Sequence, residues 1–235
     1  MEEIHVITVS DNDGFVPALL PQFVVLGMLN EYMGRQIIEG GSTVERFFVD
    51  ERPLANIFAK YLASYGQGLG ADLGGISVVH ANTGHAYVES TEMNTRVNAL
   101  YRFEFEPDRF MTTPDGRKHR YANVALGIED FPAKRSMLYT SATMDSRFSY
   151  LYGVLLRFGQ DGMIVQMANA SPKIELIERL LEEVGVEWVE HRYTVGGAPT
   201  CNRVAFGADH RLTTLLQAAL SERAAAFADA GSAAR

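Results

Sequence analysis

The sequence predicts an α+β fold, a largely antiparallel sheet with helices packed on one face. Its composition is that of an ordinary globular chain, with 47% apolar and 21% charged residues. Between about residues 74 and 170, apolar residues tend to recur at every second position, which is typical of strands with one buried face. Residues 148–224 are then interpreted as a ββαββα arrangement. Strands grouped before helices favour α+β over strictly alternating α/β.

The first elements are predicted from β-branched residues and from helix start and stop signals. Residues 4–9 are rich in β-branched side chains and predict a strand. After a polar turn, the next segment predicts a helix over about 15–34. A second helix is expected over about 52–66, because Pro53 suits a first turn and Gly66 ends the helical spacing.

The middle of the chain is predicted to be rich in hairpins. Residues 101–105 alternate aromatic with charged side chains, which predicts a strand. A partner strand over about 121–128 is expected to return after the turn signal at 114–116. Two further strands, over 148–158 and 163–168, flank a glycine-bearing hairpin.

The C-terminal part has the clearest signals. A helix is expected to begin at Ser171 and to end at Gly185. Strands over 186–195 and 203–206 follow, and Asp209 is expected to cap a last helix. This part supplies most of the ββαββα order.

We expect residues 1–224 to form one compact domain, with an alternative boundary near residue 70, where glycines gather. The alanine-rich end, 225–235, is expected to be disordered. Extensive disorder elsewhere is excluded by the apolar content.

Charge bears on the class of partner. The chain has a formal net charge of −8, and an acidic protein repels a phosphate backbone. No basic stripe with interleaved aromatics is visible, so we expect no nucleic-acid partner. The basic run at 117–120 is interpreted as the solvated end of a hairpin, with an anion site as the alternative.

The sequence also indicates a location. The acidic start lacks the basic region of a secretion signal. The most apolar stretch, residues 18–29, is shorter than the roughly 20 residues of a spanning helix. A lone cysteine, Cys201, forbids an intramolecular disulfide and suits a reducing compartment. We therefore expect a cytoplasmic protein with no membrane contact.

The strongest candidate site lies in a predicted hairpin whose loop is residues 81–84. In that register His80 and His85 face each other, and cross-strand partners have Cβ atoms about 4.5–5.5 Å apart. Counting by two places Tyr87 and Glu89 on the same face. Two imidazoles, a phenol and a carboxylate can carry out general acid–base catalysis, because histidine titrates near neutrality. Solvent-exposed hairpin histidines without a catalytic role are the alternative.

A second candidate is the thiol of Cys201, which follows a glycine-bearing loop. His191, on the preceding predicted strand, could activate it as a nucleophile. A lone cysteine that serves only packing is the alternative.

A third candidate is Asp11-Asn12-Asp13-Gly14, which follows the first predicted strand. Two carboxylates at the end of a strand can bind magnesium and attack phosphorus, and this string resembles the first motif of haloacid-dehalogenase-type phosphatases. The resemblance implies alternating β and α units and a later acidic motif, and the sequence has neither. A turn with a helix cap is the alternative explanation.

These observations predict an enzyme that acts on a small polar metabolite by histidine-based acid–base catalysis, with isomerisation, hydrolysis and group transfer left open. No metal and no cofactor is predicted. The alternative is a non-catalytic module that binds a ligand, or a partner as a homodimer through a sheet edge. The residues assigned to the site are His80, His85, Tyr87, Glu89, His191 and Cys201.

Overall fold

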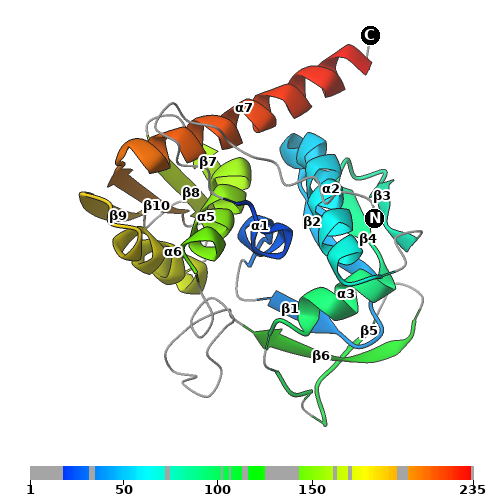
Figure 1. Ribbon diagram of the computed structural model, residues 1–235. Helices are drawn as coiled ribbons and strands as arrows, with labels where there is room; N and C mark the ends of the chain where they lie inside the picture. Colours follow the sequence, from blue (N-terminus) through cyan, green and yellow to red (C-terminus); the bar gives the residue numbers. More distant parts are fainter. Residues whose placement is uncertain are drawn as a thin grey trace.

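A computed structural model of the chain shows helices and antiparallel sheets, so the predicted α+β class is confirmed (Figure 1). The structure describes residues 18–31, 35–71, 75–101, 103–105, 107–112, 116–124, 143–160, 163–168, 171–194 and 201–233. The expected strand over 4–9 and the Asp11–Gly14 string lie outside these residues.

The described elements form two halves with the same order, helix–strand–strand–helix–strand–strand–helix. The first half consists of α1 (Pro21–Met28), β1 (Arg35–Ile38), β2 (Thr43–Phe47), the short 3-10 helix η1 (Val49–Glu51), α2 (Arg52–Gly68), β3 (Ser77–His80), β4 (Ala86–Glu89) and α3 (Thr91–Asn98). The second consists of α5 (Met144–Phe158), β7 (Gly159–Gln160), β8 (Ile164–Ala168), α6 (Ser171–Glu183), β9 (Trp188–Thr194), β10 (Cys201–Gly207) and α7 (His210–Ala233). Between them in the sequence lies the hairpin of β5 (Phe110–Thr112) and β6 (Lys118–Val124).

The two halves also share a sheet topology. The second-half sheet has the order β7-β8-β10-β9, and the first-half sheet has the order β2-β4-β3, which is the same arrangement without its first strand. That missing strand is β1, which pairs instead with β6 in a third sheet, β1-β6-β5. Helix α2 packs on the first-half sheet, whereas α5 and α6 pack on the second-half sheet.

The halves meet where α1 packs against α5, and this contact depends on one glycine from each helix. A Cβ atom at Gly27 would lie 2.2 Å from the carbonyl oxygen of Tyr150, and one at Gly153 would lie 2.2 Å from that of Val24. Real Cβ atoms are not found so close to a backbone atom, so a larger residue would force the helices apart. The repeat therefore places its two glycines at the point where the two backbones touch.

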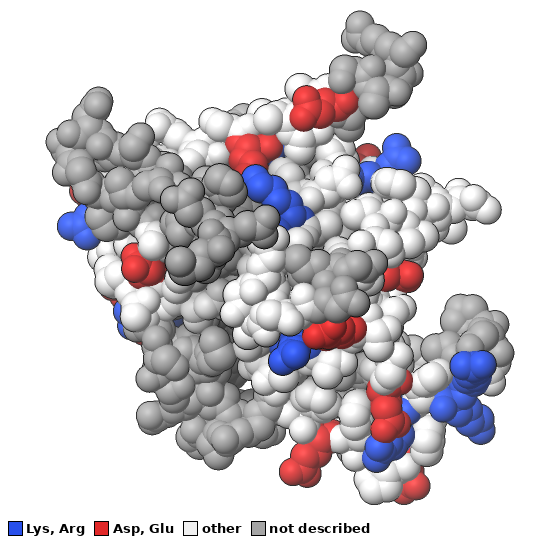
Figure 2. Space-filling view, turned by 45° about the vertical axis from the view of Figure 1, so that its right-hand side comes forward, with Lys and Arg blue, Asp and Glu red and all other residues white. Residues whose placement is uncertain are grey.

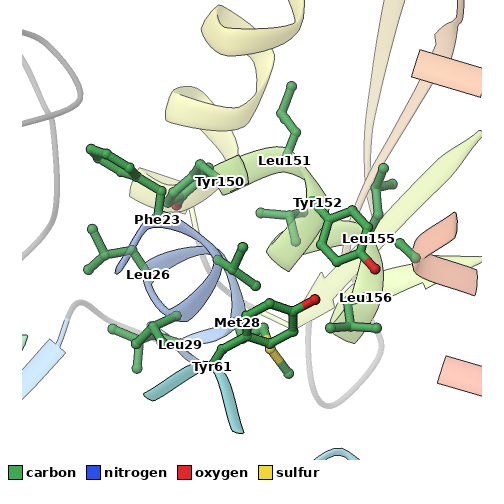
Figure 3. Packing of buried hydrophobic residues seen from close by; sticks show 14 of the residues in the cluster. Phe23, Leu26, Met28, Leu29, Tyr61, Tyr150, Leu151, Tyr152, Leu155 and Leu156 are labelled. Carbon is green, nitrogen blue, oxygen red and sulfur yellow. The ribbon is translucent and has the colours of Figure 1, made fainter. Parts of the chain in front are cut away.

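Large apolar side chains surround the helix pair (Figure 3). From Phe23 to Met28 every residue of α1 is buried, which explains why its sequence is apolar on all sides. The buried side chains labelled in Figure 3 are Phe23, Leu26, Met28, Leu29, Tyr61, Tyr150, Leu151, Tyr152, Leu155 and Leu156.

Among the residues that the structure describes, no helix is long and apolar enough to cross a membrane.

The strand predicted over 148–158 is wrong, because this segment is the helix α5. Thr143 caps it by accepting a hydrogen bond from the Ser146 backbone N–H at 3.2 Å. Helices α1, α6 and α7 and the second-half sheet all pack against α5, so α5 has no polar face. Its buried tyrosines and phenylalanine imitate strand composition, so neither composition nor period reveals the helix.

Other expected boundaries also differ. Of the segment 101–105, the described residues form no strand, and Tyr101 instead turns its hydroxyl to Glu31. The expected helix over 15–34 is shorter, because α1 begins at Pro21 and the backbone turns to an extended conformation at Leu29. Helix α7 continues to Ala233, through the alanine-rich segment that was expected to be disordered.

The C-terminal elements agree with the sequence. Helix α6 occupies the predicted segment, and Gly185, at φ 84°, follows its end in the left-handed conformation that glycine adopts most easily. Asp209 accepts a hydrogen bond from the Leu212 backbone N–H at 2.9 Å and so caps α7. The ββαββα order is present, with β7 and β8 as its first two strands.

The glycine contact generates a stability prediction. Gly27→Ala and Gly153→Ala should each lower the free energy of unfolding by at least about 2 kcal/mol, because the added methyl group overpacks a backbone contact. Gly68→Ala is the matched control, since no heavy atom lies within 4 Å of a Cβ there. Denaturant unfolding should show the control unchanged or slightly more stable; equal stability of all three variants would contradict the contact.

Candidate functional site

The predicted histidine pair is wrong, because the hairpin turns one residue later than expected. The Ala81 N–H bonds the carbonyl of His85 at 2.9 Å, and Gly84, at φ 84°, closes the turn with its N–H on the carbonyl of Ala81. His80 therefore pairs with Ala86 and not with His85. A shift of one residue moves a side chain to the opposite face of a sheet, so the two imidazoles point to opposite sides.

His85, Tyr87 and Glu89 do share a face, as predicted, but His85 and Glu89 make separate local contacts. The ring nitrogen Nδ1 of His85 lies 2.9 Å from the Thr83 hydroxyl, within its own turn. The carboxylate of Glu89 accepts a hydrogen bond from the Thr43 hydroxyl at 3.5 Å, across the strand pair. Both side chains are thus occupied by local contacts.

The proposed pairing of Cys201 with His191 is also wrong. His191 points toward α6, where its ring contacts the Glu178 carboxylate at 3.1 Å and the side-chain oxygen of Asn202 at 2.8 Å. Cys201 pairs with Thr194 and lies on the other face of the sheet. In the described ranges, no group of three or more His, Cys, Asp or Glu side chains could hold a metal ion.

The structure draws attention instead to the open face of the second-half sheet. On this face Arg203 lies between Gln166 of β8 and Arg192 of β9, its register partners. All three side chains are exposed. At the end of the sheet Trp188 lies across Gly207, where a Cβ would come within 2.4 Å of the indole nitrogen, and it is 51% exposed.

The first-half sheet has an open face of the same kind. Arg46 of β2 and Val79 of β3 flank Tyr87 of β4, and both flanking residues are exposed. The Arg46 guanidinium stacks on the ring of Phe48, 4.8 Å from its centre. Arginine and aromatic side chains therefore occur on the open sides of both sheets.

Between these faces lies a groove of about 730 Å³ at the C-terminal ends of α1 and α5. Asn30 and Phe158 come from the two helix ends, Gln36 and Arg46 from one half, and Gln166 from the other. Both open faces thus contribute to its wall.

The groove wall is held from behind by Arg35 of β1, which is buried. It donates to the side-chain oxygen of Asn98 at 2.7 Å, to that of Asn94 at 3.1 Å and to the carbonyl of Val44 at 3.1 Å. These bonds fix β1 and β2 against α3.

Beneath the groove the guanidinium of Arg157 is completely buried at the end of α5. It donates to the carbonyl oxygens of Met28, at 2.6 Å, and Arg46, at 2.8 Å. It also forms a two-pronged pair with the Glu51 carboxylate, at 3.2 and 3.0 Å, and contacts Glu45 at 3.5 Å. One side chain therefore joins both central helix ends to β2 and η1.

A buried lysine, Lys173, binds the C-terminal end of α1. Lys173 donates to the carbonyl oxygens of Leu26, Gly27 and Leu29, at 3.2, 2.7 and 2.6 Å. These carbonyls belong to the last turn of α1, where intrahelical partners run out. Burial lowers the pKa of the Lys173 ammonium to about 8. Nearby, burial raises the pKa of the Glu31 carboxyl, which accepts a bond from the Tyr101 hydroxyl at 2.5 Å.

The charges on one face of the molecule are dispersed. On the face shown in Figure 2, Lys and Arg side chains occur in small groups beside Asp and Glu. The basic run at 117–120 belongs to the β5–β6 hairpin, as the sequence predicts. The open-face arginines Arg46 and Arg203 were missed, although the alternation of buried and exposed residues in β10 places Arg203 on a wet face.

Comparisons with known proteins give one structural likeness. No family model and no curated protein matches the sequence. A solved structure described as the crystal structure of I-DmoI in complex with DNA and Ca aligns with a TM-score of 0.45 and 11% identity, over 82% of this chain and 85% of that one. At this level of similarity the likeness does not assign a function to this chain.

The expected function must be corrected. An enzyme for a small polar metabolite conflicts with the geometry, since His80, His85, His191 and Cys201 are not brought together. It also differs from the solved structure just described, which is a DNA complex. The expectation that nucleic acid is no partner is not kept either. It depended on net charge and on the absence of a basic stripe in the sequence, and neither describes how charges are distributed on the folded surface.

The buried arginine yields a prediction about stability. Arg157→Met should lower the free energy of unfolding by about 3–5 kcal/mol, because two carboxylates near it lose their buried partner. Arg147→Met is the control on the same helix: Arg147 pairs with Glu183 near the surface, and its loss should cost at most about 1 kcal/mol. Chemical denaturation measures both, and similar losses would contradict the role assigned to burial.

The lysine predicts a pH dependence. Between about pH 8 and 10.5 the unfolded chain, with an ordinary lysine pKa of 10.5, binds more protons at Lys173 than the folded chain. The contribution of this residue to the free energy of unfolding should therefore rise with pH, by up to about 3 kcal/mol. Lys173→Met should lack this rise; parallel pH profiles of the two proteins would contradict a lowered pKa.

Proposed function

We propose that the chain binds double-stranded DNA through the open faces of its two sheets and the groove between them. The observation that carries the proposal is the repeated arrangement: each half presents a sheet face that no described helix covers, beside the paired ends of α1 and α5. A DNA duplex presents the same phosphate backbone on both sides of any point along its axis. Two equivalent sheet faces, one on each side of the helix pair, can therefore each contact their own stretch of the duplex.

The side chains on these faces have the chemistry of base and phosphate contacts. Arginine can donate two hydrogen bonds to guanine, and glutamine can pair with adenine, both in the major groove. Arg46, Gln166 and Arg203 are exposed where such contacts require it. Arg192 is exposed as well, and its guanidinium pairs with the Glu190 carboxylate on the same face at 2.8 Å. The major groove of B-form DNA is about 12 Å wide and admits a two-stranded ribbon, whereas that of A-form RNA is too narrow.

Two acidic groups that line the groove do not oppose this proposal strongly. Glu45 and Glu51 both contact the buried Arg157, and Glu45 also accepts the backbone N–H groups of Asn30 and Arg46, at 2.9 and 2.8 Å. The single positive charge of Arg157 offsets part of their negative charge from within the protein.

A DNA partner and a lone cysteine are both consistent with a reducing compartment such as the cytoplasm.

Binding to a mixed-sequence duplex of 30 base pairs tests the proposal. Arg203→Ala should weaken binding about tenfold, which corresponds to the roughly 1–3 kcal/mol of one lost arginine contact. Arg96→Ala is the control, because Arg96 lies on α3 and pairs with Glu92; it should bind as the wild type does. Fluorescence anisotropy at low salt measures both. Absence of wild-type binding, or equal loss in both variants, would overturn the proposal, as would preference for duplex RNA.

A further inference from the structure

We infer that the β5–β6 hairpin is an arm that contacts the phosphate backbone of the bound duplex, beyond the part held by the sheet faces. This inference depends on the proposed DNA-binding function. The hairpin stands outside the repeat, since it lies between α3 and α5 and has no counterpart among the described elements of the second half.

The pairing register shows that the hairpin continues the groove wall. Gln36 and Ile38 of β1 line the groove, and their partners on β6 are Asn123 and Tyr121. Counting back by two along β6 leads from Tyr121 to His119, on the same side of the sheet. The groove-facing surface therefore runs on from β1 into the hairpin.

Basic side chains accumulate along this continuation. The Arg109 guanidinium lies over the Tyr121 ring, 5.1 Å from its centre, and its Nε donates to the Tyr121 hydroxyl at 3.2 Å. Arg117 and Lys118 are exposed at the end of the hairpin, where Arg117 continues the side of His119 and Tyr121 and Lys118 begins the opposite side of the strand. This gathering of positive charge contrasts with the net charge of −8 for the whole chain.

The arm is held in place at its base. The Arg120 Nε donates to the Glu39 carboxylate at 2.9 Å, and the His119 ring contacts the Glu39 backbone carbonyl at 3.0 Å. Because Glu39 lies in the turn after β1, these bonds join the hairpin to the groove wall. A held arm loses less conformational entropy on binding than a free one.

The reach of the arm fits a duplex. From Tyr121, beside the groove, to Arg117 is four residues, or roughly 13 Å along an extended strand. That length is close to the width of about 12 Å of the B-DNA major groove. A duplex seated on the sheet faces would thus have its next stretch of backbone phosphates within reach of Arg117 and Lys118.

Salt dependence distinguishes the arm from the sheet faces, because each phosphate contact contributes about 0.9 to the slope of log K against log salt concentration. The variant Arg117→Gln with Lys118→Gln should reduce that slope by about two and weaken binding uniformly across duplex sequences. The matched control, Lys60→Gln with Arg96→Gln, removes the same charge from α2 and α3 and should leave the slope unchanged.

The outcomes separate this inference from the proposed function. If the wild type binds the 30-base-pair duplex and the hairpin variant keeps the wild-type slope, the arm is overturned while DNA binding stands. A slope that falls equally in the control variant also overturns the arm, since the effect would then be one of net charge. If the wild type does not bind, both proposals fail. Thermal unfolding of each variant verifies that it is folded.

Discussion

The backbone contact between Gly27 and Gly153 determines the rest of this structure. Because neither glycine has a Cβ, α1 and α5 approach closely enough for their two halves to share one hydrophobic core. The helix ends then emerge together, and the sheet of each half is placed beside them with one face uncovered. The groove and both open faces are consequences of this single approach.

The same approach creates an electrostatic problem that buried cations resolve. Two helix C-termini lie close together, each with carbonyl groups that lack partners, and the partial negative charges of the ends add. Lys173 satisfies the end of α1, and Arg157 joins that end to Glu51 across the repeat. Arg223 donates to the carbonyl of Leu156 at 3.2 Å and so serves the end of α5. Positive charge is thus placed inside the protein, directly beneath the groove.

The sequence was informative where elements are half-buried and less so where they are fully buried or depend on exact register. Helix α6 has one wet face and a glycine stop, so period and punctuation both reveal it. Helix α5 has no wet face, because its contacts surround it, and the glycine that follows it, Gly159, was interpreted as part of a hairpin. The histidine hairpin was located correctly, but an error of one residue at Gly84 reversed the face of His80. Net charge was a poor guide to the class of partner, because it averages over surfaces that are chemically different.

Hydroxyl-radical footprinting of side chains, with and without the duplex, shows whether duplex DNA lies across the two open faces. Four exposed side chains report on it: Phe48, Trp188, Met144 and Tyr193. Phe48 and Trp188 belong to the open faces, whereas Met144 lies at the far end of α5 and Tyr193 on the opposite side of its sheet. DNA bound across the open faces should lower oxidation of the first two side chains and leave the second two unchanged. Protection of Met144 and Tyr193, with Phe48 and Trp188 still reactive, would contradict it.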